Sequence, residues 1–236
     1  MNNIKIIFED SSIVVLDKPS GITVNKADTT VGETTVQDFL EEKFKFQNPG
    51  NDESDFYKRA GIVHRIDKET SGILIAAKNK ESFENLQGQF KERKVEKTYI
   101  ALVHGHVGFG SGEINVPVGR LPWNRKRFGV LAGGKEAITF YKVINEYEKP
   151  FALLELKPKT GRTHQIRVHL KYFNHPIFGD EFYAGRKTSR DDRKLLQRFF
   201  LHATHISFFH PKSGGRVEFE SPLPLELENV LRAIKD

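Results

Sequence analysis

One aspartate in this chain stands where a side chain could do chemistry. Asp67 lies between two cations, Arg65 and Lys68, and His64 comes just before them. The neighbouring cations should favour the charged form of the carboxylate. An ionised carboxylate held on a loop can act as a nucleophile or as a base. The simpler alternative is a surface loop with a local ion pair, and these residues alone favour it.

The elements that must position this loop can be predicted from the pattern around it. The apolar run 73–77 directly after the loop predicts a buried strand. Two short strands are predicted at 4–8 and 12–16, and the sequence Lys18-Pro19-Ser20-Gly21 then predicts a tight turn. We interpret Lys18 as a structural residue of that turn, with contact to phosphate as the less favoured alternative.

Several helices and further strands are predicted along the chain. Helices are expected at 35–46, 80–93, 163–173 and 224–235, from apolar spacing and from candidate caps at Thr34 or Thr35, Asn79 and Thr163. Strands are expected at 95–104, 113–118, 136–144, 151–157, 201–209 and 216–220. The polar segment 47–58 predicts an exposed loop. The mixed-charge stretch 186–198 predicts a mostly helical, solvated segment.

The residues around Asp67 also resemble a known signature. His64-Arg65-Ile66-Asp67, followed by Thr70-Ser71-Gly72, resembles the signature loop of the RluA family of RNA pseudouridine synthases. The family pattern has Leu where this chain has Ile66, which is a volume-conserving exchange. The resemblance implies that Asp67 is the catalytic residue. It also implies that His64 and Arg65 meet RNA, with Arg65 filling the place of the displaced base.

Three more motifs resemble the family in the same order along the chain. Lys18-Pro19-Ser20-Gly21 resembles the first motif, and Lys97-x-Tyr99-x-Ala101 resembles the family strand whose tyrosine lies against the target base. Residues 160–170 resemble the third motif, whose arginine corresponds to Arg167 and pairs with the catalytic aspartate. Arg162 is a second cation there, either structural or facing phosphate. Segments 175–180 and 200–203 also have family counterparts.

A basic stretch is the predicted RNA contact outside the catalytic residues. Residues 119–135 carry five cations and no acid, with Trp123 and Phe128 interleaved among Arg125, Lys126 and Arg127. Cations suit phosphates and aromatic rings suit unstacked bases. A solvated loop is an equal alternative on composition alone, and the family resemblance favours RNA binding.

The composition bounds the remaining function classes. The 236 residues carry 37 basic and 31 acidic side chains, a net charge of +6 that indicates an anionic partner. The chain contains no cysteine, which excludes disulfides, thiol nucleophiles and thiolate zinc sites. No apolar run is long enough to span a bilayer, and a cytoplasmic protein is expected. Histidines 164, 169 and 175 do not have metal-ligand spacing, so buried, hydrogen-bonded histidines and no metal site are predicted.

Together these observations predict an α+β fold with a mixed, largely antiparallel central sheet, flanking helices and an RNA-binding cleft. The resemblance implies a single catalytic domain over residues 1–236, without the S4 domain of larger members. The implied reaction isomerises uridine in tRNA or rRNA to pseudouridine without a cofactor, and a monomer is expected. A non-catalytic RNA-binding or RNA-folding protein is the main alternative, and a metal-dependent hydrolase is a second. Whether Asp67 attacks C1′ or acts as a base stays open.

Overall fold

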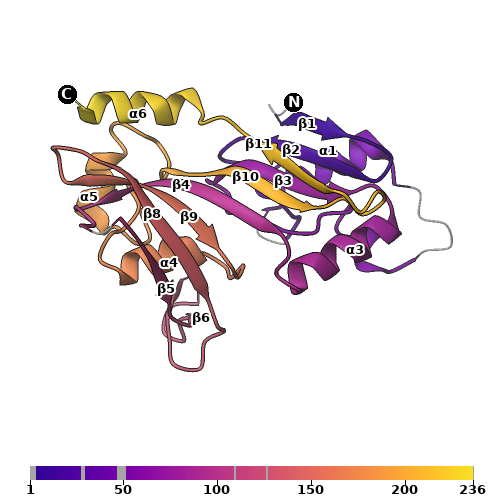
Figure 1. Cartoon of the computed structure of the whole chain (residues 1–236), viewed down its shortest axis with the longest axis horizontal. Coiled ribbons are helices and arrows are strands. Elements are labelled where there is room, and N and C mark those ends of the chain that lie inside the picture. Colours follow the sequence, from indigo (N-terminus) through magenta and orange to yellow (C-terminus); the bar gives the residue numbers. More distant parts are fainter. Residues whose placement is uncertain (1–3, 28–29, 47–51, 109, 126, 236) are drawn as a thin grey trace. The chain divides into compact units, whose positions relative to one another are not determined.

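The computed structural model describes residues 4–27, 30–46, 52–108, 110–125 and 127–235 (Figure 1). The chain forms two compact units. The first comprises residues 1–96 and 205–221, and the second comprises residues 97–204 and 222–236. No helix within the described ranges is long and apolar enough to cross a membrane.

The first unit is built on antiparallel strands. Strand β1 (Lys5–Glu9) pairs with β2 (Ile13–Lys18), and β2 pairs with β3 (Ser71–Ala77). Strand β10 (Leu201–Phe209), of which residues 205–209 belong to this unit, pairs with β11 (Arg216–Glu220). The predicted bounds of β10 and β11 are confirmed. Strand β3 is buried along its whole length, as its apolar run predicts.

Helix α3 (Lys80–Lys91) covers the core of this unit. Its Phe83 and Leu86 are buried in one cluster with Ile73 and Ile75 of β3. Asn79 accepts a hydrogen bond from the backbone N–H of Ser82 at 2.9 Å, so the predicted helix cap is confirmed. The loop that carries Asp67 therefore leads into a strand that is held by a well-packed core.

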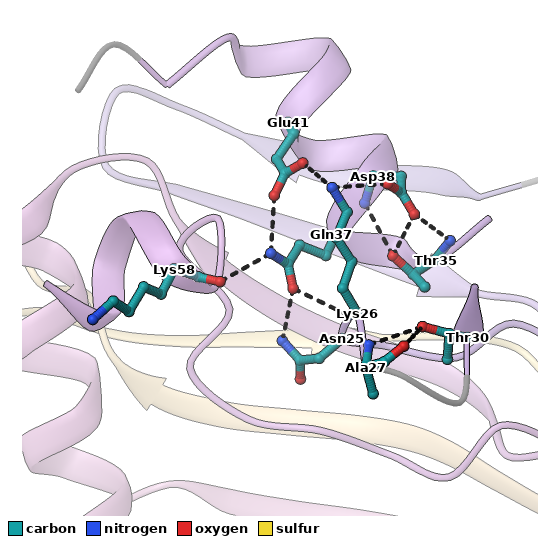
Figure 2. Close-up of polar contacts among 9 residues, drawn as sticks. All are labelled: Asn25, Lys26, Ala27, Thr30, Thr35, Gln37, Asp38, Glu41 and Lys58. Carbon is teal, nitrogen blue, oxygen red and sulfur yellow. Dashed lines mark hydrogen bonds and ion pairs between the residues drawn. The ribbon is translucent and has the colours of Figure 1, made fainter. Parts of the chain in front are cut away.

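Helix α1 (Val36–Phe44) begins at Thr35, one of the two predicted caps. Thr35 and Asp38 form a reciprocal capping box, and the side chain of Lys26 pairs with Asp38 and Glu41 (Figure 2). The buried amide of Gln37 donates to the backbone carbonyl of Lys58 at 2.9 Å. That bond ties α1 to α2 (Asp55–Lys58), a short helix within the segment 47–58 that was predicted to be a loop.

The second unit contains a four-stranded antiparallel arrangement. Its strands are β4 (Glu96–His104), β9 (Phe151–Pro158), β8 (Ile138–Glu146) and β5 (Ser111–Asn115), paired in that order. Helices α4 (Gln165–Tyr172), α5 (Arg186–Asp192) and α6 (Leu225–Lys235) belong to the same unit. The α+β class and the largely antiparallel sheet are confirmed.

Three sequence-based expectations for this unit are wrong in detail. Part of the stretch 119–135 is not an open loop, because β6 (Val118–Arg120) and β7 (Phe128–Val130) pair as a hairpin. Helix α4 begins after His164, which has a φ of 56° and makes no side-chain cap bond, so Thr163 is not the cap. The stretch 186–198 is not wholly solvated, since Asp192 is buried in a hydrogen bond with His104 and Arg198 in an ion pair with Glu226.

Candidate active site

Asp67 lies on a loop that is fixed at both ends. Before it, Ile62 forms an isolated antiparallel bridge with Ala76 of β3, and after it the chain enters β3 itself. The backbone carbonyl of Asp67 accepts the N–H of Thr70 at 3.1 Å, which closes a tight turn. Ile66 is only 7% exposed, whereas Asp67 is partly exposed. The loop thus has a buried anchor beside a carboxylate that solvent can reach.

Lys18 holds this loop from inside the protein. Its side chain is fully buried, and its ammonium group donates to the carbonyls of Pro19, Ile22 and Lys68 at 2.9, 2.9 and 3.0 Å. The N–H of Gly21 also donates to the carbonyl of Lys68, at 2.8 Å. The turn at 18–21 therefore supports the Asp67 loop, which confirms the structural interpretation of Lys18.

Replacing Lys18 with methionine should loosen the loop. At least three carbonyls lose a charged donor, and we expect the free energy of unfolding to fall by about 2–4 kcal/mol. Catalytic activity should fall more than tenfold, because small displacements of a catalytic group are costly. Chemical denaturation and a turnover assay measure the two effects.

Lys68→Met is the matched control for that change. Lys68 is on the same loop, and its ammonium group pairs with Glu33 at 2.8 Å on the surface. Loss of a surface ion pair costs at most about 1 kcal/mol. Equal stability losses in the two variants would contradict the supporting role of Lys18.

The ion pair between Lys68 and Glu33 differs from the surroundings that the sequence predicts for Asp67. Lys68 was predicted to help keep the Asp67 carboxylate charged, but both oxygens of Glu33 engage its ammonium group at 2.8 Å. Arg65, the other flanking cation, is exposed. Sequence adjacency is therefore a poor guide here, because neighbouring side chains on an extended loop point in different directions.

His64 has a structural position. Its Nε2 accepts the backbone N–H of Ile75 at 3.0 Å, and its ring stacks on Phe90 with centroids 4.8 Å apart. An imidazole nitrogen that accepts an N–H bond carries no proton, so this contact requires the neutral ring. The ring joins the loop to β3 and α3, and the predicted RNA contact of His64 stays a prediction.

Arg167 is held in the second unit by a buried ion pair. Its Nε and Nη2 donate to Oδ2 and Oδ1 of Asp180 at 2.7 and 3.0 Å. The two side chains are 5% and 0% exposed. The guanidinium carbon also lies 4.4 Å from the ring centroid of Phe199 and 5.0 Å from that of Tyr183. Asp180 and these rings fix the orientation of Arg167.

Tyr99 lies in the same unit, on β4. It is 9% exposed and stands opposite Leu156 of β9 in the strand register. Lys97 is two residues earlier on the same face of the strand, and burial lowers the pKa of its ammonium group to about 8. Tyr99 and Arg167 thus belong to the second unit and Asp67 to the first, and the pairing of Asp67 with Arg167 stays a prediction.

The basic hairpin of β6 and β7 is anchored beside Arg167. The backbone N–H and carbonyl of Phe128 bond the hydroxyl of Tyr183 at 3.3 and 3.2 Å, and the Arg127 guanidinium lies over the ring of Phe182. At the tip, Arg120 donates to the carbonyl of Arg125 at 2.6 Å.

Two residues of this hairpin are exposed where RNA contacts are predicted. They are Trp123, which is 76% exposed, and Arg125, while Lys126 lies outside the described residues.

Two residues beside Arg167, namely Asp180 and Tyr183, were not among the predicted site residues. The only sequence signal for Asp180 was its place in the family-like segment 175–180.

The remaining motif residues have mainly structural partners. The side-chain oxygen of Gln165 accepts hydrogen bonds from the hydroxyl of Thr160 and the backbone N–H of Arg162. Its side-chain nitrogen donates to the carbonyl of Ile138 and the hydroxyl of Thr139, both at the start of β8. The Nε of Arg162 donates to the carbonyl of Glu136 at 2.9 Å, so its side chain is at least partly structural.

Histidines 164, 169 and 175 each form a hydrogen bond with another group of the protein. His164 bonds the hydroxyl of Tyr183, His169 bonds the carbonyl of Val116, and His175 bonds the carbonyl of His104. Burial lowers the pKa of His169, only partly offset by its bond to Val116. Across the described ranges, no group of His, Cys, Asp and Glu side chains could hold a metal ion.

Comparison with known proteins adds an independent line of evidence. Residues 12–172 match the family model described as RNA pseudouridylate synthase. The chain is 42% identical over 232 residues to an uncharacterized RNA pseudouridine synthase of Aquifex aeolicus (strain VF5), across 96% of this chain and 72% of that protein. It is 37% identical over 237 residues to ribosomal large subunit pseudouridine synthase D of Neisseria meningitidis serogroup A, across 98% of this chain and 61% of that protein.

The solved structures agree with the sequence relatives. Human RNA Pseudouridylate Synthase Domain Containing 1 is 26% identical to the chain and superposes with a TM-score of 0.71, over 99% of this chain and 95% of that chain. The order of the motifs, the family model and the fold all lead to one assignment, and the resemblance drawn from the sequence is confirmed. The chain belongs to the RNA pseudouridylate synthase family.

Proposed function

We propose that this RNA pseudouridine synthase modifies uridine in the RNA of the large ribosomal subunit, with Asp67 as its catalytic carboxylate. The observation that carries the choice of RNA is the similarity to proteins named ribosomal large subunit pseudouridine synthase D and C, at 37% and 36% identity. The observation that supports Asp67 is its place in the signature loop, where buried Lys18 donates to the backbone carbonyl of the next residue, Lys68. This substrate class would place the work of the enzyme in the cytoplasm.

The reaction is an isomerisation, so its atoms balance within the substrate. The N1–C1′ bond breaks, the uracil turns, and a C5–C1′ bond forms while the proton on C5 is lost and N1 gains one. A carboxylate can assist either by attacking C1′ or by removing a proton. Since no electrons leave the nucleoside, the proposed reaction uses no redox cofactor.

Arg167 and Tyr99 are proposed to serve the same step as Asp67. A guanidinium near a carboxylate favours its charged form, and the bidentate bond from Nε and Nη2 to Asp180 fixes the plane of the Arg167 guanidinium. The ring of Tyr99 would stack on the target base. These roles rest on the family motifs, and each can be tested by substituting the residue.

The base must leave its stack before Asp67 can act on it. Extrusion of a nucleotide costs a few kcal/mol, which contacts to phosphates and unstacked bases can offset. We assign the phosphate contacts to Arg125, Lys126, Arg127 and Arg162, and the space left by the base to Arg65. The exposed ring of Trp123 is suited to stack on an unpaired base.

Trp123→Ala should therefore weaken RNA binding. Loss of one stacked base costs about 1–3 kcal/mol, which is an increase of about 5- to 150-fold in the dissociation constant. Fluorescence anisotropy with an unmodified large-subunit RNA transcript measures the change. The matched control is Tyr172→Ala, since Tyr172 is an aromatic residue that is 56% exposed at the end of α4. Equal losses in both variants would argue against a specific role for Trp123.

Mapping pseudouridines in a deletion strain and its parent tests the proposed substrate. One or more large-subunit sites should lose pseudouridine on deletion and regain it with the wild-type gene. Loss confined to tRNA would overturn the choice of RNA and leave the enzyme class intact. An unchanged map, with RNA binding retained, would favour the non-catalytic alternative.

A further inference from the structure

The second unit carries an open concavity lined largely by cations. Its volume is about 620 Å³, and its walls come from α5, the turn after it, and Glu181. Four basic side chains line it, namely Arg186, Arg190, Arg193 and Lys194. We call it the cationic concavity. The composition of 186–198 predicted a solvated segment, because the sequence mixes cations with Asp191 and Asp192.

The fold buries one of these two aspartates and pairs the other with a lysine. Asp192 is 6% exposed, and its Oδ2 accepts the N–H of Gly179 at 2.8 Å and contacts Nε2 of His104 at 2.9 Å. Asp191 pairs with Lys194 at 2.8 Å. The pKa of Asp191 is lowered, first by the bond from Lys194 and further by the charges of Arg190 and Lys187. Neither acid of α5 is therefore bonded to the guanidinium of Arg186 or Arg190: Asp192 is bonded to Gly179 and Asp191 to Lys194.

Arg186 and Arg190 are the two cations that a ligand could use. Both side chains are exposed, and no ion pair or hydrogen bond joins either guanidinium to another residue in the described part of the chain. They are four residues apart on α5, so they lie on one face of the helix. Arg193, by contrast, pairs with Glu181 at 3.3 Å and donates to the carbonyl of Gly179 at 2.9 Å.

The helix that presents these cations is held rigidly. Asp192 and Arg193 bind the N–H and the carbonyl of Gly179 respectively, so α5 is fixed to the turn at residues 179–181. Because the backbone of α5 is held, binding of an anion needs to order only the two arginine side chains. The same turn carries Asp180, whose carboxylate holds Arg167. Glu181, in the wall of the concavity, is the next residue after Asp180.

We propose that the cationic concavity binds phosphodiester groups of the substrate RNA through Arg186 and Arg190. The proposal rests on the proposed function, because the turn at 179–181 links the concavity to the residue that positions Arg167. Guanidinium groups suit phosphate oxygens in both charge and geometry. The contacts carry no sequence information, so they fix where the RNA lies and add affinity.

The double variant Arg186→Gln with Arg190→Gln tests this site through salt dependence. Each lost phosphate contact reduces the slope of log K against log salt by about 0.7 for a single strand or 0.9 for a duplex. The ratio of the wild-type association constant to that of the variant should therefore fall by about 7- to 12-fold between 50 and 200 mM salt. Anisotropy titrations of the whole protein with an unmodified large-subunit RNA transcript give both slopes.

The control double variant is Arg232→Gln with Lys235→Gln, which removes the same charge from α6. Both residues are exposed, and they lie on another helix of the same unit. Equal slopes for the two double variants would show a general effect of net charge and overturn the proposal, as would an unchanged slope for Arg186→Gln with Arg190→Gln.

The outcome is separable from that of the proposed function. Wild-type protein that makes pseudouridine, together with an unchanged slope in the Arg186 and Arg190 variant, overturns the phosphate site alone. Wild-type protein that makes no pseudouridine, together with the expected loss of slope, overturns the catalytic proposal and leaves an RNA phosphate site.

Discussion

Asp67→Asn should make no detectable pseudouridine while it folds and binds RNA as the wild type does. Asparagine keeps the size of the side chain but can neither attack C1′ nor accept a proton usefully. We expect turnover to fall by at least about 10³-fold, which corresponds to about 4 kcal/mol of transition-state stabilisation. The loop should keep its shape, because its supports are the side chain of Lys18 and backbone groups such as the N–H of Gly21.

The assay for this variant must separate chemistry from binding. Single-turnover pseudouridine formation on an excess of enzyme reports the chemical step, and anisotropy reports RNA affinity. Glu69→Gln is the matched control, since it removes one negative charge two residues away on the same loop. Substantial pseudouridine from Asp67→Asn would end the assignment of Asp67, and an equal loss in Glu69→Gln would point to the charge of the loop instead.

Arg167→Met should reduce both stability and activity. The substitution leaves the carboxylate of Asp180, which is fully buried, without its bidentate partner. Breaking a buried pair by removing one partner costs about 3–5 kcal/mol. Activity should fall as well, because Arg167 is proposed to orient Asp67. Chemical denaturation and single-turnover assays measure the two losses, and an unchanged free energy of unfolding would contradict the importance of the pair.

A second substitution separates the two roles of Arg167. In the double variant Arg167→Met with Asp180→Asn, no buried charge is left unpaired, and an amide oxygen can still accept the N–H groups of Phe182 and Tyr183. We expect most of the lost stability to return while activity stays low. Recovery of both would mean that Arg167 only neutralises Asp180 and does not act in the reaction.

Much of the fold could be predicted because its signals are local. The apolar run of β3, the caps Thr35 and Asn79, and the strands at 201–209 and 216–220 follow from short-range pattern and capping chemistry. The signature loop around Asp67 could also be located, because its residue types recur in a fixed order. The expected extent of the domain, residues 1–236, stays a prediction.

The errors share a physical cause, which is that hydrogen-bond and ion partners come from distant parts of the chain. Lys68 pairs with Glu33 rather than with its neighbour, and the stretch 119–135 becomes a hairpin because β6 and β7 meet and Phe128 docks on Tyr183. Thr163 is not the helix cap, since the turn before α4 is set by the bonds of Gln165.

The sequence by itself determined the family, the position of the signature loop and most of the strands, since each is encoded in residues close together along the chain. Tertiary structure alone decided that Lys18 donates to the carbonyl of Lys68 in the loop, that Asp180 binds Arg167, and that Asp192 of α5 is buried against Gly179. Charge composition counts ionisable groups, but only the folded chain determines which of them face each other and which face the RNA.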